Sequence, residues 1–412
     1  MGEIALNEVA YEPKKERALV LTLSFGYGHV RAAQAIAQQL RTILSPERVL
    51  LLDALDGCRF FFHLFYVWPY WAMIRHAPKL WARLFTARRH HMHKKTAPAL
   101  LFEWGCAHVF RTIESFAPDV IIAVEVAACE IAALARRRGQ TEARILAVIT
   151  DYETEPVWVQ DEVSHYAVAD SHTAEQLCAW GVRKDAISVT GIPSITETGS
   201  EKKALAHHRL DDGRPVVLLM GGGMGPTRMD QVAAHLCSCG EPLQLIAIAG
   251  RDERARRALA RLQATPPVTL HRIGWTDDVP SFMKAADVLI SKPGGLTLTE
   301  AANCALPLVL YDPIPGPEEK NAMRLVEGGA ALLARDPKQA AEYALALLRD
   351  DARRQEMKVQ LARFAASDAA QRIARLALHG EDPRMSADGR SEDGFYRNSQ
   401  TYQTVEPIAQ RA

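Results

Sequence analysis

This chain lacks several features that would assign it to a large class of proteins. None of its apolar runs reaches the ~18 to 20 uninterrupted residues that cross a bilayer, and residues 1–17 lack the apolar core of a signal peptide. The seven cysteines are scattered, and none shows the paired spacing of a zinc site. These absences predict a globular protein of the reducing cytoplasm, with neither a membrane span nor a structural zinc ion.

An excess of one charge is also missing. Lys and Arg together number 49, and so do Asp and Glu, so no overall positive field favours nucleic acid as a partner. Hydrophobic residues make up 48% of the chain, which is enough for an ordinary buried core. Because 412 residues exceed the size at which one core usually stops growing, we expect two domains.

Strand-like runs alternate with helical runs, which is typical of parallel sheets built from βαβ units. A polar stretch at residues 191–204 separates two such series, as interdomain linkers do. The strands are expected at residues 17–24, 49–53, 120–124, 145–150 and 165–168, and then at 216–220, 244–249, 268–273, 288–290 and 307–311. We therefore expect an α/β protein with domains at residues 1–195 and 196–350, helices at 351–379 that pack back toward the first domain, and a disordered tail at 380–412.

The strongest local motif, Ser-Lys-Pro-Gly-Gly-Leu-Thr-Leu-Thr-Glu at residues 291–300, lies between an expected strand and an Ala-rich helix. Glycines let the backbone approach a ligand closely, and the amides at a helix N-terminus attract phosphate. Glu300, one turn into the helix, offers two oxygens to the hydroxyls of a ribose. The motif predicts a nucleotide diphosphate site; the alternative is a tight turn at Gly294 and Gly295, with Glu300 capping the helix.

A second loop follows the expected strand at residues 307–311 and reads Asp-Pro-Ile-Pro-Gly-Pro-Glu-Glu-Lys-Asn. Open α/β sheets bind their ligands at the carboxyl ends of the strands, where this loop lies. The acidic and amide groups of Glu318, Glu319 and Asn321 suit the hydroxyls of a sugar. The alternative is an acidic helix start that the helix dipole favours.

Five segments in order resemble the donor domain of the monogalactosyldiacylglycerol synthase and processive diacylglycerol glycosyltransferase family, which shares the GT-B fold with the peptidoglycan lipid-linked GlcNAc transferase. They are Gly221 to Gly225, Gly250-Arg251, Gly274-Trp275, residues 292–300 and residues 316–321. The N-terminal half resembles the family too, at Ser24 to His29, at Thr150-Asp151-Tyr152 with Trp158 downstream, and at Gly191-Ile192-Pro193. This resemblance covers residues 20–331.

The resemblance implies two Rossmann-like domains facing each other across a cleft, and transfer of a hexose from a UDP-sugar to diacylglycerol or a glycosyl-diacylglycerol, with inversion at the anomeric carbon. Inversion needs a base for the proton of the acceptor hydroxyl. His29 is the first candidate and Asp151 the second, either as the base or as the group that orients the imidazole; alone, His29 could instead cap its helix.

The same resemblance names the residues that would hold the donor. Because no Asp-x-Asp pair occurs, neither a metal nor a cofactor is expected, and helix N-termini and backbone amides would stabilise the diphosphate. The uracil would lie near residues 273–275. The expected donor-binding residues are Gly28, Gly222, Gly223, Arg251, Trp275, Gly294, Gly295, Thr297, Glu300, Gly316, Glu318, Glu319 and Asn321.

Residues 60–85 are unusually rich in aromatic side chains, and a basic run follows them. Aromatic residues favour the bilayer interface, and adjacent cations favour anionic lipid. We expect peripheral association with the inner face of the membrane; the alternative is an aromatic core segment followed by a solvated basic loop. The expected acceptor and membrane residues are Phe65, Tyr66, Trp68, Tyr70, Trp71, Trp81, Arg88, Arg89 and Trp158.

Two departures from the family pattern leave the substrates open. Pro317 and Lys320 replace a Gln and a Gly of the family's sugar-recognition loop, and Glu155 lies near where the family has a histidine. The identity of the hexose is therefore open, and so is the handling of the acceptor. Other readings are transfer to another lipid or small hydrophobic acceptor, or a catalytically silent nucleotide-sugar-binding protein. A dehydrogenase is disfavoured because no third glycine continues Gly26-x-Gly28.

Overall fold

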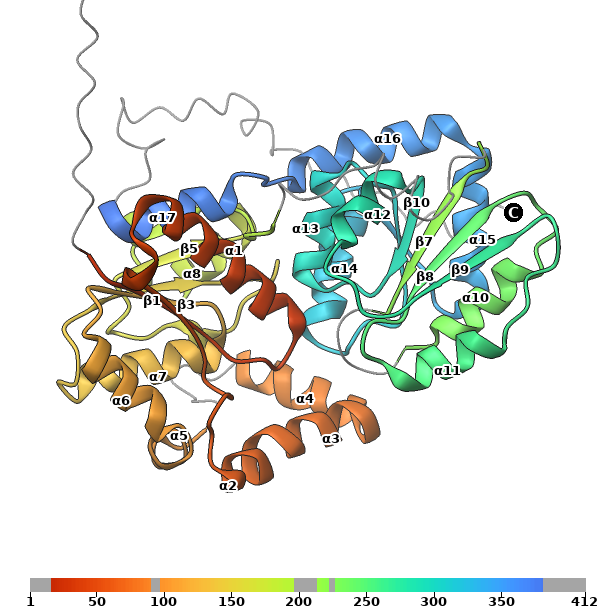
Figure 1. Ribbon diagram of the computed structural model, residues 1–412. Helices are drawn as coiled ribbons and strands as arrows, with labels where there is room; N and C mark the ends of the chain where they lie inside the picture. Colours follow the sequence, from red (N-terminus) through yellow and green to blue (C-terminus); the bar gives the residue numbers. More distant parts are fainter. Residues whose placement is uncertain (1–15, 90–96, 196–212, 222–226, 381–412) are drawn as a thin grey trace, which may run out of the picture.

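The computed structural model describes residues 16–89, 97–195, 213–221 and 227–380. Two six-stranded parallel sheets, each flanked by helices, lie side by side (Figure 1). Their central strands are buried apolar runs, such as Ala-Leu-Val-Leu-Thr in the first, because helices cover both faces of a parallel sheet. The expected α/β class with two Rossmann-like sheets is thereby confirmed.

The first sheet has the strand order β2-β1-β3-β4-β5-β6. All five strands expected in this half are present, with ends within two residues of those predicted. A sixth, β6, was not predicted because it is only three residues long. The strands are β1 (Ala18–Thr22), β2 (Val49–Asp53), β3 (Val120–Ala123), β4 (Arg144–Val148), β5 (His165–Val168) and β6 (Ile187–Val189).

The second sheet has the order β12-β11-β10-β7-β8-β9. Read from β9, this is the 3-2-1-4-5-6 order of a dinucleotide-binding fold. The three-residue strand β12 was not predicted. The strands are β7 (Val216–Met220), β8 (Gln244–Ile248), β9 (Thr269–Ile273), β10 (Val288–Ser291), β11 (Leu308–Leu310) and β12 (Ala331–Leu333).

Helices connect the successive strands and cover the sheets. In the first half these are α1 (Tyr27–Ile43), α7 (Val126–Arg137) and α8 (Ser171–Ala179). Glu125 caps α7, because its carboxylate accepts hydrogen bonds from the amides of Ala127 and Ala128. In the second half they are α10 (Met229–Cys237), α11 (Glu253–Arg261), α12 (Val279–Ala285), α13 (Gly295–Asn303), α14 (Pro317–Glu327) and α15 (Pro337–Arg349).

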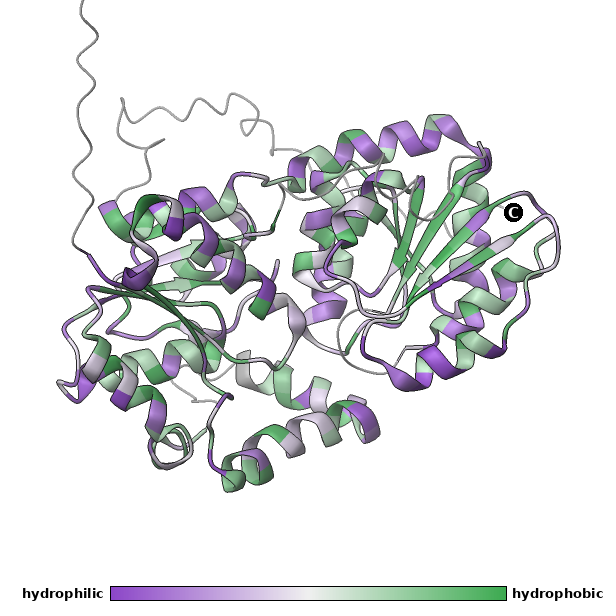
Figure 2. Ribbon diagram, in the orientation of Figure 1, coloured by the Kyte–Doolittle hydropathy of each residue, from purple (hydrophilic) through white to green (hydrophobic). Residues whose placement is uncertain are grey.

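A long helical excursion separates β2 from β3 and contains the aromatic segment. Its buried residues Phe62 and Phe102 join the core of the first sheet. Within the excursion Phe62 lies against Gly105, where a Cβ atom would lie 2.4 Å from the Phe62 ring. Figure 2 shows apolar residues along α2 and α3 at the outer edge of the molecule. The excursion comprises α2 (Phe60–Phe62), a π-helical turn (His63–Val67), α3 (Trp68–His76), α4 (Pro78–Arg89), α5 (Ala99–Gly105) and α6 (Ala107–Phe116).

The chain returns to the first sheet at its end. Helix α16 (Asp351–Leu361) flanks the second sheet, whereas α17 (Ala369–His379) packs against α1 (Figure 1). The strands of the two sheets fall within residues 18–189 and 216–333. The predicted boundary at residue 195 adjoins residues outside the described part, as does most of the predicted disordered tail, so both stay predictions.

Candidate active site

A cavity of about 280 Å³ lies between the two sheets and is lined by residues of both halves. Its walls come from the loops that follow β1, β4, β7, β8, β9, β10 and β11, all at the carboxyl ends of their strands. Parallel α/β sheets place their ligand sites at this edge. Here two such edges face each other across one cavity.

Two helix N-termini meet at the cavity, one from each half. Gly28 and His29 begin α1, and Gly295 and Thr297 begin α13; all four line the cavity. Neither helix has a side-chain cap, so the first amides of both helices lack side-chain acceptors. Amides and helix dipoles of this kind attract anions.

The halves approach closely at Gly295. A Cβ atom at this position would lie only 2.1 Å from the carbonyl oxygen of Thr150, in the loop that follows β4. A residue with any side chain would therefore push the two halves apart. The glycine of the motif serves the contact between the halves as well as the cavity, a role that the motif alone did not indicate.

His29 and Asp151 both line the cavity, as the sequence predicted. The Nδ1 atom of His29 lies 2.8 Å from the Thr150 hydroxyl oxygen. Burial lowers the pKa of His29 below its ordinary value, although the Asp151 carboxylate and a hydrogen bond with the Val124 backbone oppose the shift. The imidazole is therefore neutral near pH 7 and able to accept a proton.

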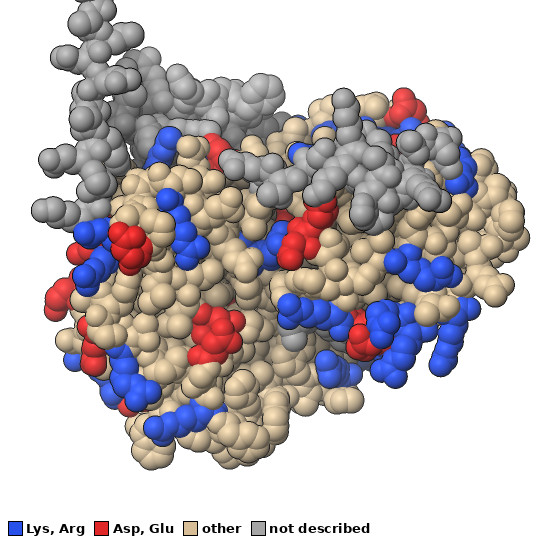
Figure 3. Space-filling model, viewed as in Figure 1, with Lys and Arg blue, Asp and Glu red and all other residues tan. Residues whose placement is uncertain are grey.

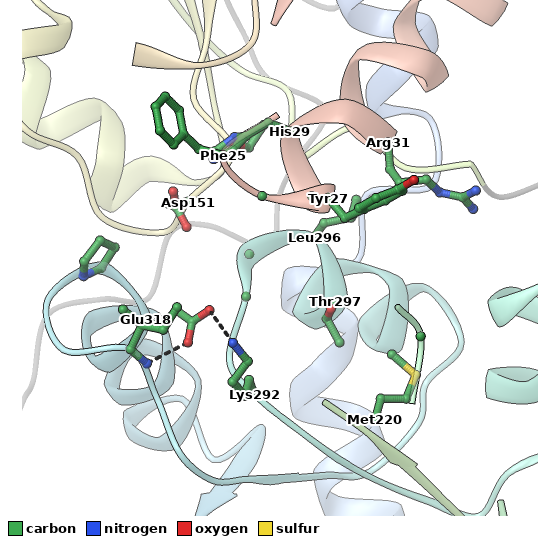
Figure 4. A pocket seen from close by; sticks show the side chains of 18 of the residues that line it. Phe25, Tyr27, His29, Arg31, Asp151, Met220, Lys292, Leu296, Thr297 and Glu318 are labelled. Atoms are coloured by element: carbon green, nitrogen blue, oxygen red, sulfur yellow. Dashed lines mark hydrogen bonds and ion pairs between the residues drawn. The ribbon is translucent and has the colours of Figure 1, made fainter. Parts of the chain in front are cut away.

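Three charged side chains lie on the wall formed by the second half. Lys292 Nζ lies 3.9 Å from Glu318 Oε1, and Glu318 Oε2 accepts a hydrogen bond from the Ile314 amide. In Figure 4 the Asp151 carboxylate lies between His29 and Glu318. Burial raises the pKa of Glu318, with Lys292 opposing the shift, and burial raises the pKa of Glu300 to about 7, with Arg31 opposing it.

Aromatic side chains from the helical excursion close the opposite side of the cavity. Tyr70 and Trp71 of α3 and Trp81 of α4 line it together with Phe25. The Phe25 and Tyr70 rings are 5.0 Å apart, and the Tyr70 and Trp81 rings are 5.2 Å apart, both edge to face. This wall is apolar, in contrast to the charged wall across from it.

Contacts between the halves also line the rim. The Arg251 guanidinium lies 4.3 Å from the Trp275 ring centre and 4.9 Å from that of Tyr27, and the two rings are 4.4 Å apart. Arg31 of α1 pairs with Asp277 at 3.3 Å. Trp275 lines the cavity, whereas Arg251 contributes only this stacking contact and its neighbour Gly250 lines the cavity instead.

Several predicted site residues lie away from the cavity. The amide of Gly316 donates to the Glu319 carboxylate, so Glu319 caps α14. Asn321 is fully buried between the halves. Trp158, predicted to face the acceptor, is only 7% exposed and packs in the first core; that prediction is wrong. Tyr66 packs against Phe25 and Phe102, whereas Phe65 and Trp68 are exposed.

Some predictions fall where the structure gives no answer. Gly222 and Gly223 lie outside the described residues, and the side chains of Arg88 and Arg89 are not described either. Across the described ranges, His, Cys, Asp and Glu form no group of three or more that could hold a metal ion. Donor binding without a metal or cofactor stays a prediction.

The sequence also left some lining residues unnamed as site residues. Phe25 and Tyr27 lie inside the Ser24 to His29 segment, so the motif itself was a signal for them. Arg31, two residues further along, and Met220, at the end of a buried strand, had no such signal. Their place in the cavity depends on how the halves face each other.

Comparison with known proteins agrees with this architecture. The model of the monogalactosyldiacylglycerol (MGDG) synthase family matches residues 29–194, and that of glycosyl transferases group 1 matches residues 215–363. The processive diacylglycerol beta-glucosyltransferase of Bacillus licheniformis is 25% identical over 343 residues, which cover 82% of this chain and 88% of that protein.

Solved structures show the fold. Acinetobacter baumannii MurG is 16% identical with a TM-score of 0.59, covering 88% of this chain and 99% of that one. Anabaena Alr3699/HepE, solved in complex with UDP-glucose, is 17% identical with a TM-score of 0.51, covering 88% and 95%. The expected GT-B fold is confirmed.

Proposed function

We propose that this chain is a member of the monogalactosyldiacylglycerol synthase family of GT-B glycosyltransferases and moves a hexose from a UDP-sugar to diacylglycerol or a glycosyl-diacylglycerol at a membrane surface. The observation that carries the proposal is a cavity shared by the halves, where the N-termini of α1 and α13 meet, with charged side chains from the second half and aromatic side chains from the first. Each wall suits one of the two substrates.

The donor fits the charged wall. The N-termini of α1 and α13 provide amides for a diphosphate, and Lys292 adds a positive charge beside them. Glu300 is placed to accept hydrogen bonds from ribose hydroxyls, and Trp275 offers a surface for the base. The sugar then lies toward Glu318 and Asp151. The solved Anabaena relative of the same fold binds UDP-glucose.

The reaction is a displacement at the anomeric carbon. The acceptor oxygen forms a bond to this carbon, the bond from the carbon to the phosphate oxygen breaks, and UDP leaves with the electron pair. The acceptor hydroxyl gives its proton to neutral His29, whose imidazolium the Asp151 carboxylate then stabilises. The attack comes from the face opposite the diphosphate, so the configuration inverts.

The acceptor reaches the cavity along the aromatic wall. Tyr70, Trp71 and Trp81 line the cavity, while other apolar side chains of the same excursion are exposed to solvent: Phe60 at 68%, Phe65 at 66% and Trp68 at 50%. An exposed apolar surface of this kind marks a docking site. We name it the outer aromatic patch and define it as Phe60, Leu64, Phe65, Trp68, Leu100 and Trp104.

The surface around the outer aromatic patch, which is mainly uncharged with cations nearby, favours a bilayer surface as the partner. Figure 3 shows mainly uncharged residues over α2, whereas Lys and Arg gather over α11 on the other half. Exposed cations near the aromatic residues of the excursion include Arg59, Arg75, Lys79 and Arg83. Within the described ranges, no helix is long and apolar enough to span a bilayer. The patch would therefore hold the protein peripherally, by aromatic insertion and attraction to anionic lipid.

The test is UDP release by the purified protein, with a panel of UDP-hexoses and with diacylglycerol in vesicles that contain or lack anionic lipid. We expect release only when one particular UDP-hexose and diacylglycerol are both present, and faster release on anionic vesicles. A β-linked product from an α-linked donor would establish inversion. UDP binding without release from any pair, unaffected by His29→Ala, would point to a silent binding protein instead.

A further inference from the structure

Asn321 joins the two halves at the point where the charged wall meets Asp151. Its side chain is fully buried and makes three hydrogen bonds through its two polar groups. The Nδ2 group donates to Asp151 Oδ1 at 2.8 Å and to the Pro293 carbonyl at 3.2 Å, and Oδ1 accepts from the Tyr152 amide at 2.9 Å. Both amide donors are therefore used, and the side chain does not line the cavity where a sugar would lie.

These bonds connect a helix of the second half to a loop of the first. Asn321 lies in α14, three residues after Glu318, which lines the cavity. Asp151 also lines the cavity and acts on the charge of His29. Since a helix moves as a rigid unit, a shift of the wall that carries Glu318 would shift the bond that holds the Asp151 carboxylate.

We propose that Asn321 is a positioning residue, which fixes the Asp151 carboxylate beside His29 when the two halves are closed, and does not bind the donor sugar. This inference rests on the proposed function, because it assigns Asn321 a part in the same reaction. The hydrogen bond engages Asp151 Oδ1, and Asp151 also lines the cavity. Closure of the two halves thereby determines the position of the carboxylate that acts on the His29 base.

The charged and titratable groups around Asp151 come from four segments. His29 lies on α1, Glu318 lies on α14, Lys292 follows β10 and pairs with Glu318, and the Tyr152 ring follows Asp151 in the chain. Asn321 is the uncharged member of this set and the one that bonds the Asp151 side chain directly. Its replacement therefore changes the position of Asp151 and leaves those charges in place.

A second asparagine provides a matched control. Asn303 of α13 also joins the halves, since its Nδ2 donates to Ser194 Oγ at 3.1 Å and its Oδ1 accepts from the Ala366 amide at 2.7 Å. It does not line the cavity. We expect Asn321→Ala to lower kcat about 100-fold, with the KM for the UDP-sugar within about twofold, because a misplaced catalytic group costs about this much. Asn303→Ala should lower the melting temperature and leave kcat unchanged.

Asn321→Asp sharpens the test through pH. When protonated, the new carboxyl donates to Asp151 as the amide does; when ionised, it repels Asp151. The ratio of kcat for this variant to kcat for the wild type should therefore fall as the pH rises, whereas the ratio for Asn303→Asp should not depend on the position of Asp151 and should stay flat. A raised KM for the UDP-sugar at unchanged kcat would overturn the inference and assign Asn321 to the sugar.

One measurement needs no turnover. NMR titration of His29 should show a further lowered pKa in Asn321→Ala, because the carboxylate that stabilises the imidazolium is displaced, and no change in Asn303→Ala. An unchanged His29 pKa in a folded Asn321→Ala protein would overturn the positioning role. If the His29 pKa falls in Asn321→Ala but the wild-type protein transfers no sugar, the proposed function alone would be overturned.

Discussion

The two halves of this protein have nearly the same sheet but different surroundings. In the second half, β7, β8 and β9 are adjacent and short βα units follow each strand. In the first half the chain leaves the sheet after β2, and the aromatic excursion of α2 to α6 takes the place of a third strand beside it. The regular half builds the charged wall, and the irregular half builds the aromatic wall and carries His29 and Asp151.

This difference suits the two α/β halves to two different substrates, a nucleotide-sugar and a lipid. A nucleotide diphosphate is recognised by backbone amides and a few fixed charges, which regular strand-to-helix turns provide. A lipid acceptor needs an apolar approach, which a sheet edge cannot offer without extra helices. Changes on the two walls should therefore have different effects: loss of the base or of exposed aromatic side chains should lower turnover or membrane binding, and loss of a charged-wall side chain should weaken donor binding. Changes at Gly295 or Asn321, where the halves touch, should lower turnover.

The largest effect is expected for His29→Ala. Loss of the base should lower kcat by about 10²- to 10⁴-fold, while UDP binding stays nearly unchanged because the substitution leaves the backbone amides of α1 and the charged wall in place. UDP release and calorimetric UDP binding measure the two separately. Because burial lowers the pKa of His29, wild-type activity should also persist below pH ~6.5, the ordinary pKa of histidine. A loss of UDP affinity as large as the loss of kcat would contradict the assignment of His29 to catalysis and not to donor binding.

Gly295→Ala tests the place where the halves touch. The new methyl group would lie 2.1 Å from the Thr150 carbonyl oxygen, so the halves must separate. We expect a loss of kcat of about 100-fold, since a shift of 1 Å can cost this much, together with a lower melting temperature. Gly274→Ala, where a Cβ atom meets nothing within 4 Å, should keep the wild-type melting temperature. Wild-type turnover in Gly295→Ala would show that the halves need not close.

Glu300→Gln should affect donor binding alone. The pKa of Glu300 is raised to about 7, and a carboxylate accepts ribose hydroxyls best when ionised, so donor affinity should rise with pH. Between about pH 6 and pH 8 the gain should reach about tenfold. In Glu300→Gln the affinity should be weaker at high pH and independent of pH. A kcat effect at saturating donor would contradict the assignment.

The smallest effect is expected at the outer aromatic patch. Joint replacement of Phe65 and Trp68 by Ala should weaken binding to anionic vesicles about tenfold, since each loses a large insertable side chain, and should leave UDP binding unchanged. Vesicle sedimentation measures the loss. Val359→Ala is the control, because Val359 is 65% exposed on α16, away from the excursion. Equal vesicle binding by all three proteins would remove the patch from the membrane proposal.

The sequence predicted well wherever a local pattern determines the structure. Continuous apolar runs such as residues 49–53 and 216–220 became the strands β2 and β7 with the expected ends. The glycine motif brought Gly294, Gly295 and Glu300 to the cavity. The strands β6 and β12 were missed because three residues make no recognisable pattern.

The loop at residues 316–321 shows the limit of such reasoning. The resemblance treated Glu318, Glu319 and Asn321 as one sugar-binding set, but successive residues of a helix point about 100° apart. Glu318 faces the cavity, Glu319 caps the helix and Asn321 reaches across to Asp151. Trp158 was misjudged for a related reason, since an aromatic residue suits a core as well as a surface.

The sequence by itself determined the two series of βα units, the glycine-rich turns and the aromatic composition of residues 60–85, because these depend on neighbours along the chain. The tertiary structure alone decided which aromatic side chains line the cavity, that Gly295 touches Thr150, and that Asn321 holds Asp151. Each of these contacts joins segments far apart in the chain, and their geometry depends on how two independently formed sheets face each other.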